Sequence, residues 1–157
     1  ISHDMINVEI TESTIMEDPD ALMRDIKRFR DGGYQVWMDD FGSGYSSLNV
    51  LKDYEFDEIK LDMKFMSSFD ERSKKIVKSI ISMAKQIGVQ TLAEGVETQE
   101  QFDFLRYIGC EKVQGYFFSR PLPSEQLEKT GLAEPENMEP SAMKGSAAAT
   151  WKWCTTT

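Results

Sequence analysis

The order of hydrophobic and polar positions predicts strands that alternate with helices. Short runs of β-branched and other apolar residues, some alternating with polar ones, are typical of strands. Apolar residues at helical spacing occupy the intervals between them, bounded by capping residues and glycines. We predict strands at residues 6–11, 34–39, 58–62, 89–93 and 112–115. We predict helices between Asp18 and Gly32, near Leu48, between Asp70 and Gly88, between Thr98 and Gly109, and from Ser124 to about Lys129.

The longest predicted helix begins at Asp70 and ends at Gly88. An apolar stripe along it predicts the face that packs on the sheet. Its members are Ile76, Ile80, Met83, Ala84 and Ile87.

Strands that alternate with helices imply an α/β fold, with a parallel sheet covered by helices. A (β/α)8 barrel needs about 250 residues, so the 157 residues present could supply little more than half of one. The pattern alone is also consistent with an open doubly wound sheet.

The regular pattern ends near Gly131, and this change divides the chain. We interpret residues 1–130 as one structural unit and residues 131–157 as a disordered or non-native tail. The alternative is an interaction tail that uses Trp151 and Trp153. Because a strand-like segment follows almost directly on Ile1, we expect the chain to be part of a longer protein.

Charge and composition narrow the classes of function. The net charge of −9 argues against binding to duplex nucleic acid, which requires a basic surface. No segment is long and apolar enough to predict a membrane helix. Cys110 and Cys154 form no disulfide or metal-binding pattern, which favours the cytoplasm. Since His3 is the only histidine, a metal site would have to consist mainly of oxygen ligands.

Each predicted strand carries a polar or charged residue at or near its C-terminal end. These residues are Glu9, Asp39 with Asp40, Lys60, Glu94 and Gln114. An acidic residue at one strand end usually caps a turn, but the C-terminal ends of parallel strands gather functional side chains at one edge. Converging carboxylates repel one another unless cations lie among them, and oxygen ligands select Mg²⁺ or Mn²⁺. Two such ions could bind and cleave a phosphodiester.

The segment Asp39-Asp40-Phe41-Gly42-Ser43-Gly44-Tyr45-Ser46-Ser47 is the most distinctive. Its Asp-Phe-Gly triplet also occurs in protein kinases, but the chain has neither a His-Arg-Asp loop nor a glycine-rich phosphate loop. A kinase function is therefore rejected.

Together with four other segments, this one resembles the EAL-domain family of cyclic di-GMP phosphodiesterases. The other segments are Glu9-Ile-Thr-Glu12-Ser13, Ile59-Lys60-Leu61-Asp62, Ala93-Glu94-Gly95-Val96-Glu97-Thr98, and Gln114-Gly115-Tyr116 with Pro121-Leu122. Order and spacing both match from residue 5 to about 130. The resemblance implies an incomplete (β/α)8 barrel of about five C-terminal βα units. It also implies hydrolysis of cyclic di-GMP to linear pGpG with two Mg²⁺ or Mn²⁺ ions.

The resemblance also implies roles for individual residues. The positions that match metal ligands are Glu9, Asp39, Asp40 and Glu94. Lys60 matches the lysine that holds the attacking water or offsets phosphate charge, and Gln114 a residue near water and substrate. Glu12 matches the glutamate that anchors the Asp40–Ser47 loop, and Glu97 matches a residue that supports the site near its mouth. Pro121 matches the position that contacts a guanine of the substrate.

The chain lacks the Glu-Ala-Leu segment that names the family and the asparagine-bearing strand after it, so we expect the isolated chain to be nearly inactive. A receptor that binds cyclic di-GMP without cutting it is one alternative. An enolase-type lyase that uses Lys60 as a base is another. We also expect a possible homodimer, and a diguanylate cyclase (GGDEF) or sensor domain upstream in the same protein.

Overall fold

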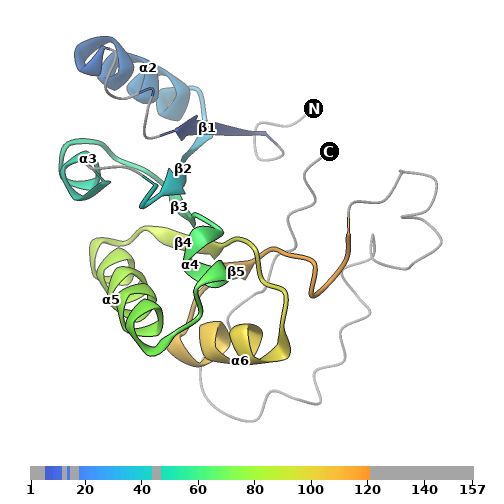
Figure 1. Ribbon diagram of the computed structural model, residues 1–157. Coiled ribbons are helices and arrows are strands. Elements are labelled where there is room, and N and C mark those ends of the chain that lie inside the picture. The colour runs from blue at the N-terminus through green and yellow to red at the C-terminus, as the bar shows by residue number, and fades with distance from the viewer. Residues whose placement is uncertain (1–5, 12–13, 15–17, 44–46, 121–157) are drawn as a thin grey trace, which may run out of the picture.

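The computed structural model describes residues 6–11, 14, 18–43 and 47–120. Within them five parallel strands form one sheet in the order β1-β2-β3-β4-β5 (Figure 1). The strands are β1 (Asn7–Thr11), β2 (Gln35–Phe41), β3 (Glu58–Leu61), β4 (Gln90–Ala93) and β5 (Lys112–Val113). The helices are α2 (Pro19–Asp31), α3 (Ser47–Asp53), α4 (Lys64–Ser67), α5 (Glu71–Ile87) and α6 (Gln99–Ile108).

This topology confirms the predicted α/β fold. The strands follow one another in chain order with every pair parallel, whereas a doubly wound sheet reverses its strand order at a switch point. The arrangement is thus that of a (β/α) barrel segment, open at β1 and β5 in the part of the chain that the structure describes. The predicted helix at 124–129 and the tail at 131–157 lie outside the described residues.

Local capping fixes the helix boundaries where the sequence predicts them. The side chains of Asp18 and Asp70 each accept a hydrogen bond from a backbone N–H in the first turn of α2 and α5. Thr98 and Gln101 form a reciprocal capping box at the start of α6. The residue after α5 is Gly88 with φ of 77°, a left-handed conformation that glycine adopts without a Cβ clash.

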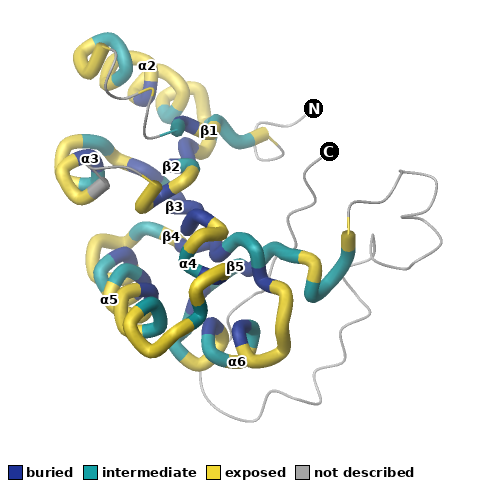
Figure 2. The backbone as a smooth tube through the Cα atoms, in the orientation of Figure 1, coloured by how far each residue is buried: buried dark blue, intermediate teal, exposed yellow. Residues whose placement is uncertain are grey.

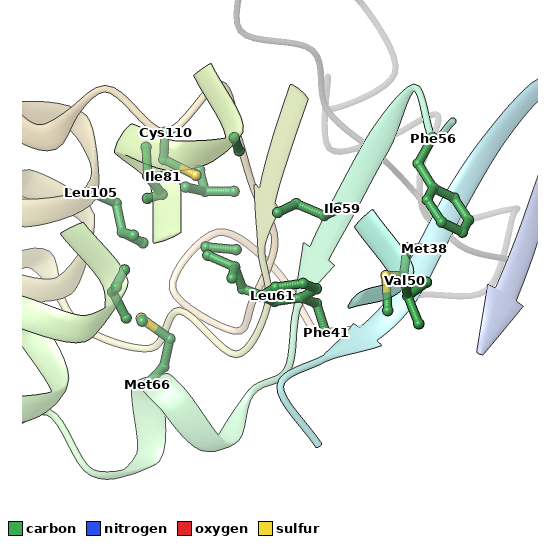
Figure 3. Close-up of a cluster of buried hydrophobic side chains, with 14 of the residues drawn as sticks. Met38, Phe41, Val50, Phe56, Ile59, Leu61, Met66, Ile81, Leu105 and Cys110 are labelled. Carbon is green, nitrogen blue, oxygen red and sulfur yellow. The ribbon is translucent and has the colours of Figure 1, made fainter. Parts of the chain in front are cut away.

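The hydrophobic core lies between the sheet and its helices (Figures 2 and 3). Alternate residues of the strands point into it, and the helices add residues such as Ile26, Val50, Met66 and Leu105. The strand residues in this core are Ile10, Val36, Met38, Phe41, Ile59, Leu61, Ala93 and Val113. Strand residues that alternate with these, such as Glu9, Trp37, Lys60, Leu92 and Lys112, belong to the opposite sheet face, which we call the inner face.

Some details differ from the sequence prediction. Ile76 and Ile87 of α5 are 42% and 50% exposed, whereas Val77 and Ile81 are buried. The predicted stripe was wrong at its two ends because α5 carries neighbouring pairs of apolar residues, which fit more than one helical face. The short helix α4 was not predicted, and β5 ends two residues earlier than expected. No helix in the described ranges is long and apolar enough to cross a membrane.

Gly115 lies where the chain leaves β5, directly against the backbone of Val96. A Cβ at this position would overlap the nitrogen and the carbonyl group of Val96, which themselves hydrogen-bond to Gln114 and Phe117. We therefore expect Gly115→Ala to lower the free energy of unfolding by about 3 kcal/mol, measured by denaturant titration. The control is Gly88→Ala, where the Cβ meets nothing within 4 Å and only the positive φ is penalised. It should cost about 1 kcal/mol. Equal losses for both variants would contradict the steric argument.

Candidate active site

Lys60 lies at the centre of a cluster of carboxylates on the inner face. Its Nζ is 2.8 Å from Asp39 Oδ1, 3.0 Å from Glu94 Oε1 and 3.3 Å from Glu9 Oε2. Glu9 belongs to β1, Asp39 to β2 and Lys60 to β3, while Glu94 directly follows β4. The predicted convergence of the strand ends is therefore confirmed for these four residues.

Burial distinguishes this cluster from a surface ion pair. The Lys60 side chain is 8% exposed, and the three carboxylates are between 23% and 36% exposed. Burial lowers the pKa of Lys60, but the hydrogen bonds and charges of Asp39 and Glu94 outweigh it, so the pKa is raised above its ordinary value. Lys60 is thus held as a cation at neutral pH. With one ammonium against three carboxylates, the cluster stays negatively charged, and a phosphodiester would be repelled without further cations.

Asp40 follows Asp39 but adopts a different backbone conformation. Its φ is 55°, and the register between β2 and β3 shifts between Met38 and Phe41. An irregularity of this kind at a strand end redirects side chains, and aspartate tolerates the left-handed region better than most residues. Asp40 is exposed at the same strand end as Asp39. Its role as a metal ligand remains a prediction.

The structure places two further predicted residues near this edge of the sheet. Gln114 donates its backbone N–H to Ala93 O at 2.9 Å and accepts from Val96 N–H at 3.1 Å, so it borders Glu94. Glu97 is exposed, and its N–H donates to Gln101 Oε1 at 2.7 Å at the start of α6. The roles given to both remain predictions. Glu12 and Pro121 lie outside the described residues.

Sequence reasoning assigned no role to three residues that the structure places around the site. Asp62 is buried, and its side chain accepts from Lys64 N–H at 2.9 Å at the start of α4, directly after β3. Glu58 and Lys112 form a buried ion pair on the inner face. Alternation could have indicated the face of Glu58, which is two residues before Lys60, but it could not have indicated the partner.

The chemistry of these side chains fits a hard divalent cation. Three carboxylate oxygens surround one Nζ, so they lie within about 6 Å of one another, whereas two oxygen ligands of one Mg²⁺ ion at about 2.1 Å lie at most about 4.2 Å apart. Among the described residues no three carboxylates already share a single coordination point. The assignment of Glu9, Asp39, Asp40 and Glu94 as metal ligands remains a prediction.

Comparison with known proteins identifies the family. The family model described as "EAL domain" matches residues 1–121. The cyclic di-GMP phosphodiesterase NbdA of Pseudomonas aeruginosa is 41% identical over 126 residues, which are 79% of this chain and 16% of NbdA. The chain thus spans only a small part of the curated relatives it matches.

Solved structures agree with this assignment. The cyclic di-GMP complex of the MucR phosphodiesterase from P. aeruginosa is 40% identical with a TM-score of 0.70, over 76% of this chain and 49% of that one. A manganese and cyclic di-GMP complex of BlrP1 from Klebsiella pneumoniae is 32% identical with a TM-score of 0.72, over 77% of this chain and 31% of the BlrP1 chain. The predicted resemblance is confirmed, and the chain belongs to the EAL-domain family.

Proposed function

We propose that this chain forms the catalytic half of a domain that hydrolyses cyclic di-GMP to pGpG with Mg²⁺ or Mn²⁺. The observation that carries the proposal is the meeting of Glu9, Asp39 and Glu94 at the buried ammonium of Lys60. The complexes of MucR and BlrP1 with cyclic di-GMP, the latter with manganese, support the choice of substrate and of a divalent ion.

In the proposed reaction a water oxygen attacks one phosphorus of the cyclic dinucleotide. The bond from that phosphorus to the 3′ oxygen breaks, the 3′ oxygen gains a proton, and the product carries a 5′ phosphate. Divalent ions would supply positive charge for the phosphodiester and activate the attacking water. Lys60 adds a fixed positive charge beside the phosphate and holds the carboxylates in place. Gln114 orients water and substrate through its amide, and Pro121 contacts a guanine.

The protonation of Lys60 argues against the lyase alternative. A general base must be neutral near the working pH, which for lysine requires a lowered pKa. Here three carboxylates surround the ammonium and the pKa is raised. Lys60 is therefore suited to act as a fixed cation and poorly suited to abstract a proton.

The test is to incubate the full-length protein with cyclic di-GMP and Mg²⁺ or Mn²⁺, and separately with EDTA, and to separate the products by chromatography. We expect pGpG only with the metal. Binding of cyclic di-GMP without any product would indicate the receptor alternative instead. If the protein neither binds cyclic di-GMP nor forms pGpG, both the hydrolase and the receptor proposals are rejected.

The isolated 157-residue chain should give little or no pGpG in the same assay, because its sheet ends at β1 in the described part and has no partner there. Turnover close to that of the full-length protein would contradict this. We further propose cytoplasmic action, homodimerisation and an upstream GGDEF or sensor domain. The much greater length of the curated relatives supports additional domains.

A further inference from the structure

A second polar cluster lies on the inner face beside Lys60. Glu58 of β3 is fully buried, and one of its carboxylate oxygens pairs with the ammonium of Lys112 in β5. Lys112 is 12% exposed, and its ammonium also lies 4.6 Å from the centre of the Trp37 ring in β2. These three residues therefore connect β2, β3 and β5, passing over β4, which lies between β3 and β5.

The energetics of this pair argue against a role in stability alone. Burying two charges removes their hydration, so a buried ion pair is often no more stabilising than apolar residues of the same size. The pKa of Glu58 is raised, because burial raises it by more than the hydrogen bond and charge of Lys112 lower it. The other oxygen of Glu58, Oε1, has no hydrogen-bond partner among the described residues. The pair thus holds a specific geometry at an energetic cost.

The position of the pair indicates what that geometry serves. Glu58 precedes Lys60 by two residues in β3, so both share the inner face, and Lys112 on the same face lies two residues before Gln114, which directly follows β5. Strand β5 has only two residues and pairs with β4 at two positions, Leu92↔Lys112 and Ala93↔Val113. Beyond this short ladder, backbone hydrogen bonds hold Gln114 to Ala93 and Val96, and side-chain contacts complete its placement relative to β3. The side chain of Lys112 makes a contact of this kind with Glu58 in β3.

We propose that Glu58 and Lys112 are positioning residues that fix Gln114 relative to Lys60. The inference rests on the proposed function, in which both of the latter residues face the substrate. The two charges of the pair offset each other, so we expect its effect on the site to be mainly one of placement. An error of about 1 Å in a substrate-contacting group can cost as much as about 100-fold in rate.

The test compares two double variants of the full-length protein. Glu58→Met with Lys112→Leu replaces the ion pair by apolar side chains and avoids a lone buried charge. Glu58→Lys with Lys112→Glu reverses the pair and keeps the connection between β3 and β5. Two readouts are followed: kcat and KM for cyclic di-GMP, and the side-chain amide resonance of Gln114 after selective ¹⁵N-glutamine labelling, assigned with Gln114→Glu.

We expect the apolar variant to keep its melting temperature and KM, to shift the Gln114 resonance, and to lose roughly 10-fold or more in kcat. The reversed pair should recover both the resonance and kcat. If the folded apolar variant leaves both unchanged, the positioning role is wrong. If the unmodified protein forms no pGpG but the resonance still moves and recovers, the pair does position Gln114, and it is the proposed function that fails.

Discussion

Replacing Lys60 with methionine is expected to reduce kcat for cyclic di-GMP by about 100- to 1,000-fold, the loss typical of one electrostatic group at a reacting centre. The Lys60 ammonium touches Glu9, Asp39 and Glu94 at once. Its removal takes away the fixed charge beside the phosphate and leaves the carboxylates free to separate. The measurement is pGpG formation at saturating metal and substrate. A variant that retains more than a tenth of the activity would remove Lys60 from the mechanism.

The same substitution should destabilise the metal-free protein by about 2 to 3 kcal/mol, because a buried charge cluster loses its cation. This is below the usual cost for a buried pair, since the carboxylates are partly exposed. As the pKa of Lys60 is raised in the folded state, its contribution is fully present at neutral pH. It is lost only as the pH rises beyond about 10.4 and through the folded pKa.

A matched control distinguishes the effect of Lys60→Met on stability from the loss of any lysine in this part of the chain. Lys64 also pairs with a carboxylate, with its Nζ 3.1 Å from Asp62 Oδ2, but its side chain is 75% exposed. Lys64→Met should change the free energy of unfolding by no more than about 0.5 kcal/mol. Added Mn²⁺ should restore more stability to Lys60→Met than to Lys64→Met, because the ion replaces the missing charge among the carboxylates.

Local sequence patterns were sufficient to predict the strands and the convergence of their ends. Strand β1 alternates cleanly, so the face of Glu9 followed from counting, and glycines and capping residues marked the ends of α5 and α6. Parallel strands in chain order then brought Glu9, Asp39, Lys60 and Glu94 to one edge.

Features that depend on tertiary contacts could not be predicted in the same way. Glu58 and Lys112 are 54 residues apart, and their pairing depends on the register of β3, β4 and β5. Helix α4 has only four residues, too few for a helical period to appear. The φ of Asp40 arises from the irregular pairing of β2 with β3, for which the sequence carries no distinct signal.

Glu94→Gln and Asp39→Asn are each expected to weaken Mn²⁺ binding by at least roughly 100-fold and to abolish pGpG formation. Loss of a residue that only hydrogen-bonds to a metal ligand costs up to about 100-fold in affinity, and loss of a ligand itself should cost at least as much. Each change keeps the shape of the side chain and removes one negative charge 3.0 Å or 2.8 Å from Lys60 Nζ. Binding is measured by calorimetry with Mn²⁺ alone, so the result does not depend on turnover.

The control for these carboxylates is Glu97→Gln, which removes the same charge only three residues after Glu94. Glu97 is exposed, and its described hydrogen bond uses the backbone N–H, which the substitution preserves. Since Glu97 is predicted to support the site without binding metal, its variant should lose less than about 10-fold in Mn²⁺ affinity. If Glu97→Gln and Glu94→Gln lower the affinity for Mn²⁺ equally, a general loss of negative charge explains both results. The cluster around Lys60 would then not be the metal site.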